Sequence, residues 1–280
     1  MAVWCRVKVD TMSLVWEKLS LGDAALHCLK VCDPEEKVKV TCDVAQLWKA
    51  GCLGVGSTSS SLPDIPGRPL RPPLVAPREL PRRKLTSVAG RAALIHAITH
   101  IEFNAINLAW DAVCRFNHLP RAFYDDWVQV ALEEAYHFCL LQEHLHSLGY
   151  EYGDFPAHDG LWEMAQKTAH DPLVRMALVP RVLEARGLDV TPGMMERLRQ
   201  VGDLRATFIL EIILRDEVGH VAVGSQWFRY LCKLRKLDSE KTFQNLINGY
   251  FKGETRGPLY REARLQAGFS EAELAMLEAS

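Results

Sequence analysis

The chain has 280 residues, of which 48% are hydrophobic, and its 33 Lys and Arg nearly balance its 35 Asp and Glu. This composition excludes a fibrous or wholly disordered protein, and a net charge of −2 is too small for a general nucleic-acid surface. No apolar run approaches the roughly 18 residues of a membrane helix. Residues 1–20 carry charges throughout, so we expect no signal peptide, no membrane contact and a cytoplasmic location, with translation starting at Met1 or Met12.

The eight cysteines include no Cys-x-x-Cys pair. Cys28 and Cys32 are four residues apart and could form a metal or redox pair. The interpretation that we favour is a set of reduced thiols that pack as small hydrophobic side chains.

The N-terminal extension, residues 1–55, is expected to hold two helices over 24–31 and 33–50, the second one opened by Asp33-Pro34. Residues 56–85 contain seven of the fourteen prolines, a density that favours an extended conformation. We expect this segment to be an ordered strap, with Leu70, Leu74 and Val75 contacting helical residues. The alternative is a linker.

Helical patterns fill the rest of the chain. Ser87 is expected to cap a helix that ends near residue 117, and a second helix should run from about 121 to 148. A short helix over 161–169 precedes one that starts at Asp171-Pro172 and ends near 187. After an irregular break, Thr191-Pro192 should start a short helix that continues in the same direction to 201, and a long helix should cover 203–233. No segment alternates as a strand does, so we predict an all-α fold with a four-helix bundle over 86–235 and a C-terminal helical extension over 236–280.

Two Glu-x-x-His motifs lie on two of the long helices, as Glu134-Ala-Tyr-His137 and Glu217-Val-Gly-His220. Residues three apart project from one helix face, so each pair can bind one metal ion. Two motifs on two helices are stronger evidence than one, because Glu and His are common on helix surfaces.

Two further carboxylates occur at matching positions, since Glu102 precedes Glu134 by 32 residues and Glu184 precedes Glu217 by 33. Glu102 and Glu134 are nearly equidistant from the turn at 118–120, so antiparallel helices should bring them to the same height. The chain thus contains a degenerate repeat of a helix hairpin, with the carboxylates and imidazoles that a two-metal bundle uses.

The neighbours of these carboxylates are apolar, and four buried carboxylates repel one another unless cations are bound. Oxygen ligands together with imidazole favour iron or manganese, so we expect two Fe ions, or Fe and Mn.

Four nearby residues were weighed against these ligands. Glu133 is an alternative to Glu134. Asp216 is expected to hydrogen-bond a metal-bound histidine, as carboxylates often do. Glu211 lies off the ligand face and is expected at the core edge or beside the ligands, while Tyr136 is either an oxidisable neighbour of the site or a plain core tyrosine.

The double Glu…Glu-x-x-His pattern resembles the ferritin-like di-iron superfamily of rubrerythrins, bacterioferritins and tRNA-modifying di-iron hydroxylases. From about Leu21 onwards the chain also resembles the bacterial family called domain of unknown function four-five-five, on stretches such as PGRPLRPPLVAPRELPRR, HAITHIEFNAINLAWDA, YGDFPAHDGLWEMA, LVPRVLEARGLDVTPGMMERL and LEIILRDEVGHVAVGSQWF. The resemblance implies a ferritin-like bundle whose metal ligands are Glu102, Glu134, His137, Glu184, Glu217 and His220.

The hypothesis is therefore a di-iron carboxylate protein that activates O2 as a hydroxylase or oxidase on a small or nucleoside-type organic substrate. An outside reductase or ferredoxin would supply electrons, because the chain has no four-cysteine rubredoxin-like module. The alternatives are a non-catalytic iron-binding or peroxide-scavenging ferritin-like protein, and a purely structural carboxylate cluster. The sequence does not identify the substrate or any catalytic residue.

Overall fold

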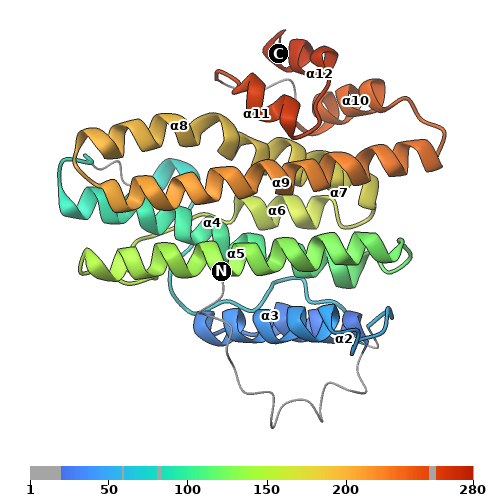
Figure 1. Ribbon diagram of the computed structural model, residues 1–280, viewed down its shortest axis with the longest axis horizontal. Helices are drawn as coiled ribbons and strands as arrows, with labels where there is room; N and C mark the ends of the chain where they lie inside the picture. Colours follow the sequence, from blue (N-terminus) through green and yellow to red (C-terminus); the bar gives the residue numbers. More distant parts are fainter. Residues whose placement is uncertain (1–19, 59, 81–83, 252–256, 280) are drawn as a thin grey trace.

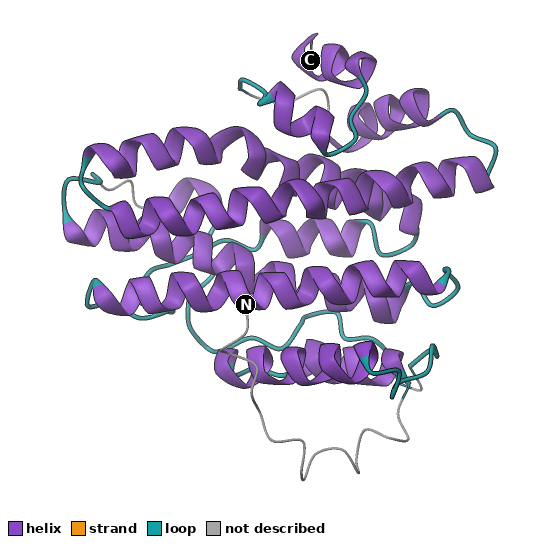
Figure 2. Ribbon diagram, viewed as in Figure 1, coloured by secondary structure: helices purple, strands orange, loops and turns teal. Residues whose placement is uncertain are grey.

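The computed structural model describes residues 20–58, 60–80, 84–251 and 257–279. Within these ranges the regular structure is helical, with isolated β-bridges but no strand (Figure 2), so the predicted all-α class is confirmed. No helix in the described part of the chain is long and apolar enough to cross a membrane.

The two N-terminal helices form as predicted. Ser20 caps α2 (Leu21–Lys30) and Asp33 caps α3 (Pro34–Lys49), each by accepting a hydrogen bond from a backbone N–H of the first turn. The buried ammonium of Lys37 donates to the carbonyl of Cys28 and to Asn107 Oδ1, both at 2.8 Å. This side chain therefore ties α2 and α3 to the first long helix of the bundle.

The proline-rich segment is packed against the rest of the chain; of the three expected anchors, Leu74 and Val75 are partly buried, but Leu70 is not. Leu70 is fully exposed, so its predicted anchoring role is wrong. Backbone groups hold the segment instead: Trp162 Nε1 donates to the carbonyl of Asp64 at 2.9 Å, and Val75 N–H donates to that of Ala157 at 2.8 Å. Extended backbone offers a donor or acceptor at every position except the proline nitrogens, so it can dock with few apolar contacts.

The first hairpin consists of α4 (Val88–Arg115) and α5 (Arg121–Ser147), with Ser87 as the cap of α4. Both helices and the turn between them agree with the predicted boundaries to within about three residues. The Tyr124 hydroxyl donates to the carbonyl of Phe116 at 3.0 Å and closes the turn. Helix α6 (Gly160–Lys167) follows the loop after α5 and packs on α4.

The third helical unit differs from the prediction. It consists of α7 (Pro172–Leu178), a π-helical turn named η2 (Val179–Glu184) and α8 (Ala185–Gln200). The predicted break between 187 and 191 is wrong, because α8 continues through Pro192 and the irregularity lies at η2. In η2 the N–H of Ala185 donates to the carbonyl of Pro180, five residues earlier, and Pro180 has no N–H of its own to donate to the preceding turn.

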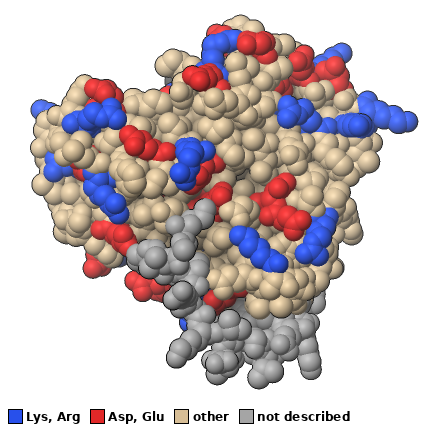
Figure 3. Space-filling view, viewed as in Figure 1, with Lys and Arg blue, Asp and Glu red and all other residues tan. Residues whose placement is uncertain are grey.

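Helix α9 (Leu204–Leu234) starts at its cap Asp203, and α10 (Ser239–Phe251), α11 (Arg261–Gln266) and α12 (Glu271–Ala279) follow. Figure 1 shows the long helices side by side, with α2 and α3 on one side and α10–α12 on the opposite side. On the face drawn in Figure 3, Lys and Arg alternate with Asp and Glu over the surface.

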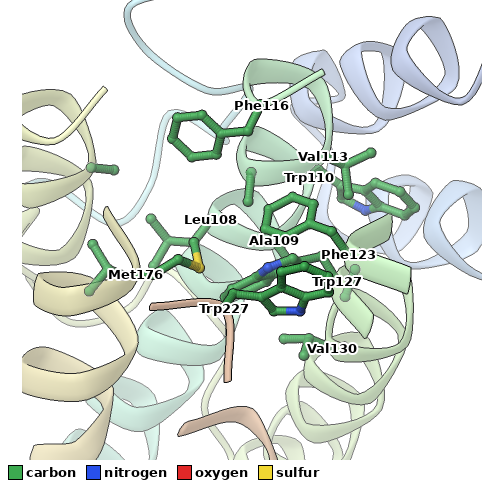
Figure 4. Packing of buried hydrophobic residues seen from close by; sticks show 14 of the residues in the cluster. Leu108, Ala109, Trp110, Val113, Phe116, Phe123, Trp127, Val130, Met176 and Trp227 are labelled. Atoms are coloured by element: carbon green, nitrogen blue, oxygen red, sulfur yellow. The ribbon is translucent and has the colours of Figure 1, made fainter. Parts of the chain in front are cut away.

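The apolar core falls into two clusters along the long helices. One contains Trp110, Phe123, Trp127 and Trp227, which lie close together in Figure 4, and the other contains Ile95, Leu141 and Ile209 among others. On α4, α5 and α9 the predicted metal ligands lie near the boundary between the two clusters. The polar site thus interrupts a core that is otherwise apolar.

Gly224 of α9 packs against the ring of Pro180 in η2, and a Cβ at this position would overlap that ring. We expect Gly224→Ala to lower the free energy of unfolding by about 1–3 kcal/mol, because overpacking forces the helices apart. Gly219→Ala is the matched control, since Gly219 lies on the same helix with open space around it and should be neutral or slightly stabilising. Urea unfolding measures both; equal stabilities of the two variants would contradict this packing.

Candidate metal centre

The first half of the site is formed by α4 and α5. Nδ1 of His137 lies 3.2 Å from Glu102 Oε2 and 3.5 Å from Glu134 Oε2. Glu102, Glu134 and His137 are buried, with at most 2% of each residue exposed. Equal distance from the 116–120 turn brings Glu102 and Glu134 to the same height, as the spacing predicted.

Helix α9 adds the second Glu-x-x-His motif to this half. One oxygen or nitrogen of each of Glu102, Glu134, His137 and Glu217 lies within 4.8 Å of the others, so this group could hold a metal ion. Nδ1 of His220 lies 3.0 Å from Glu134 Oε1 and 3.7 Å from Glu217 Oε1. The two oxygens of Glu134 therefore face two different imidazoles, whose ring centres are 5.8 Å apart.

Glu184 enters from η2 as the last residue of the π-helical turn. Its Oε2 is enclosed and has no hydrogen-bond partner among the described residues. Burial and the neighbouring charge of Glu217 raise the pKa of Glu184 to about 8. The side chain thus faces the carboxylate cluster rather than solvent, although it lies outside the tightest group of four.

Several buried polar atoms of the site lack a hydrogen bond within the described part of the chain. They are Oε1 and Oε2 of Glu134, Oε2 of Glu184, Oε2 of Glu217 and Nδ1 of His220. His220 Nδ1 approaches Glu134 closely, but at an angle that does not make a hydrogen bond. Leaving such groups unsatisfied costs free energy, and bound cations would satisfy all of them. The donor set therefore fits metal ions.

The outward nitrogens of both histidines meet further carboxylates. Nε2 of His137 lies 3.1 Å from Asp216 Oδ2, and Nε2 of His220 lies 2.8 Å from Glu133 Oε2. Asp216 lies on α9, directly before Glu217, and contacts His137 of α5. Glu133 lies on α5, directly before Glu134, and contacts His220 of α9. Such contacts fix the ring so that Nδ1 points inward, where it can ligate a metal.

The charges in the metal-free site are strongly coupled. Burial, together with the charge of Glu134, raises the pKa of Glu102, and the same two causes raise the pKa of Glu217. Burial alone would raise the pKa of Glu134, but His220 and His137 hold it well below its usual range. Burial opposes the charged imidazoles, yet the surrounding carboxylates raise the pKa of both histidines well above 6.5.

The remaining candidates lie at different places. Asp216 is in contact with His137, as expected, and also with the guanidinium of Arg215 at 2.9 Å. The ring of Tyr136 lies beside its neighbour His137, 6.3 Å between centres. Glu211 does not join the site: its side chain is half exposed and lies 3.6 Å from Arg199 on α8.

Sequence reasoning treated Glu133 as a substitute ligand, whereas the structure gives it a separate contact with His220. A signal for this role is present in the sequence, because an acidic residue precedes the glutamate of both motifs, as Glu133-Glu134 and Asp216-Glu217.

The fold and the site together define an all-helical protein with a buried cluster of carboxylates and imidazoles that could hold a metal ion. A family model described as "Protein of unknown function (DUF455)" matches residues 30–275, and the chain belongs to this family. An "Uncharacterized protein" of Haemophilus influenzae is 48% identical over 257 residues, which cover 88% of this chain and 89% of that protein. No solved structure matches the chain.

The raised pKa of Glu184 leads to a prediction about pH. Between its ordinary value of 4.5 and its folded value of about 8, the folded state keeps a proton that the unfolded state has lost. The free energy of unfolding of the metal-free protein should therefore fall as the pH rises through this window, and the raised pKa values of both histidines add to the fall above 6.5.

Thermal unfolding with a chelator at pH 6 and pH 8.5 measures this effect. We expect Glu184→Gln to reduce the difference between the two pH values, and Glu211→Gln, at an exposed carboxylate, to leave it as in the wild type. A metal-free wild type that is more stable at pH 8.5 would contradict the placement of Glu184 among the carboxylates.

Proposed function

We propose that this chain is a ferritin-like two-metal carboxylate protein, loaded with iron or with iron and manganese, which activates O2 to hydroxylate or oxidise an organic substrate. The observation that carries the proposal is the position of Glu134, whose two oxygens face His137 and His220 from opposite sides. A carboxylate so placed can join two metal ions. In di-iron bundles two helices each contribute a Glu-x-x-His motif, and the other two helices each contribute one glutamate.

Charge balance favours two ions. Glu102, Glu134, Glu184 and Glu217 carry four negative charges when ionised, which two divalent cations would neutralise. Glu102 and His137 would help to hold one ion, Glu184 and His220 the other, and Glu134 and Glu217 would supply the remaining carboxylate oxygens. Carboxylate oxygens with imidazole nitrogens suit iron and manganese, and they do not suit ions that prefer thiolate.

The burial of the site suits a reaction with a small oxidant. Glu102, Glu134 and both histidines are almost completely enclosed, while the side chains of Glu217 and Asp216 are 13% and 16% exposed. A small molecule could reach the site at this edge, whereas the other ligands are kept away from bulk water. Ferrous ions bound here would supply the electrons that reduce O2, and the protein would hold their ligands and exclude competing reactions.

Electrons would come from a separate reductase or ferredoxin. Buried thiols such as Cys28 and Cys114 lie in the apolar core, Cys32 and Cys52 are exposed, and no cluster of cysteines that could hold a metal occurs in the described ranges. The proposed substrate is a small or nucleoside-type organic molecule.

Metal binding should stabilise the protein, because the ions cancel the repulsion between buried carboxylates. Fe(II) or Mn(II) at about 100 times its dissociation constant should add about 2.7 kcal/mol, which raises Tm by about 5 °C. We expect Glu134→Ala to remove most of this rise while the metal-free variant stays folded, and Glu211→Ala to keep it. A wild type whose Tm does not change in millimolar Fe(II) or Mn(II) would refute a metal site.

Reaction with oxygen separates an O2-reactive centre from a purely structural metal site. After anaerobic loading with Fe(II), we expect O2 uptake, followed with an oxygen electrode, to scale with bound iron and to be lost in Glu134→Ala. Loaded protein that leaves O2 untouched contradicts an O2-activating enzyme, and rapid turnover of peroxide in its place would favour a scavenger.

A further inference from the structure

Arg181 is a buried cation that the proposed site does not use. It lies in η2, three residues before Glu184, and only 1% of it is exposed. Its Nη2 donates to Glu273 Oε2 of α12 at 2.7 Å, and its Nε donates to Ser225 Oγ of α9 at 3.2 Å. The ion pair thus links the turn that bears Glu184 to the last described helix of the chain.

Three aromatic rings enclose the guanidinium. Its carbon lies 4.1 Å from the ring centre of Phe243 on α10, 4.5 Å from that of Phe269, and 4.8 Å from that of Phe228 on α9. Cation–π contacts of this kind strengthen when water is excluded, as it is here. Two of the three rings belong to the C-terminal helical region, so Arg181 is enclosed only while that region is docked.

Glu273 is held in place by its own helix. Ser270 N–H donates to Glu273 Oε2 at 2.9 Å, and Glu273 N–H donates to Ser270 Oγ at 3.1 Å, which is a capping box at the start of α12. The same carboxylate oxygen therefore stabilises the first turn of α12 and receives Arg181, so the position of the helix determines the position of η2.

A second set of contacts holds the chain directly after Glu184. Arg264 of α11 donates from Nη2 to the carbonyl of Ala185 at 3.3 Å and to Asp189 Oδ2 at 2.8 Å. Glu184 thus stands between two attachments to the C-terminal helices. Figure 1 shows these helices against α7, α8 and α9, on the side away from α2 and α3.

We propose that the C-terminal helices position Glu184, through Arg181 and Glu273, and so set the affinity of the metal position that Glu184 shares with His220. This inference rests on the two-metal site proposed above. A π-helical turn is a local irregularity that is frequent at functional sites, and Glu184 Oε2 has no hydrogen-bond partner in the described chain to hold it. The metal position of Glu102 and His137 stands on uninterrupted helices and should not depend on the Arg181–Glu273 pair, which we call the clamp.

The test is an anaerobic calorimetric titration with Fe(II), which measures the affinity of each ion. The variant Glu273→Gln is compared with the control Glu271→Gln. Glu271 lies on the same helix but is exposed and pairs with Arg261. The wild type and Glu271→Gln should bind two ions. In Glu273→Gln the second ion should bind up to about 10-fold more weakly, the lower end of the effect of losing a direct partner of a ligand, because Glu273 acts on Glu184 only through Arg181 and the backbone of η2, while the first changes less than about 2-fold.

Because an unpaired buried cation can unfold a protein, the double variant Arg181→Met/Glu273→Leu provides the same test without a buried charge. General destabilisation would weaken both ions together, so the ratio of the two affinities is the deciding quantity. A wild type that binds no iron refutes the two-metal site itself. A wild type with two ions, and clamp variants with the same two affinities, refute the role of the C-terminal helices alone.

Discussion

The constraint on which this structure depends is the enclosure of four carboxylates in an apolar helical core, with Glu102 and Glu134 fully buried and Glu184 and Glu217 partly buried. Each of them would cost several kcal/mol in isolation, and together they repel one another. The metal-free protein meets this cost partly with protons, since the pKa values of Glu102, Glu184 and Glu217 are raised, and partly with the charged His137 and His220. Several oxygens stay without a partner even so, which is why the arrangement fits cations better than a purely structural role.

The surrounding residues act on the same constraint. Asp216 and Glu133 contact the outward nitrogens of the two histidines from opposite helices. Burial alone would raise the pKa of Asp216, but hydrogen bonds from His137 and Arg215 lower it to about 2. Asp216 is therefore an anion whenever the protein is folded near neutral pH, and it favours the inward orientation of Nδ1 of His137. The two apolar clusters on either side of the site hold α4, α5 and α9 at the distance that these contacts require.

Much of the fold could be predicted from the sequence, because local signals determine it. Caps such as Ser87 and Asp203, and the helical spacing around Glu102 and Glu134, depend on residues within a few positions of one another. The π-helical turn could not be predicted in the same way, because it depends on the approach of Pro180 to Gly224, which are far apart in sequence. Pro192 predicts a helix start because proline favours the first turn of a helix, but in the structure α8 continues through it. Leu70 failed as an anchor because backbone hydrogen bonds, which leave no pattern in side-chain hydrophobicity, dock the proline-rich segment.

The two halves of the site therefore differ in how their geometry is maintained. The hairpin of α4 and α5 presents Glu102, Glu134 and His137 from regular helices joined by a short turn, and its geometry follows from local structure. The second half presents Glu184 from an irregular turn, and its geometry follows from contacts with α9 and with the C-terminal helices. A degenerate repeat can keep the same residue types in both halves of the site, while the contacts that hold those residues in place differ between the halves. In this chain the contacts on either side of Glu184 reach Glu273 of α12 and Arg264 of α11, so these C-terminal helices belong to the physical description of the site.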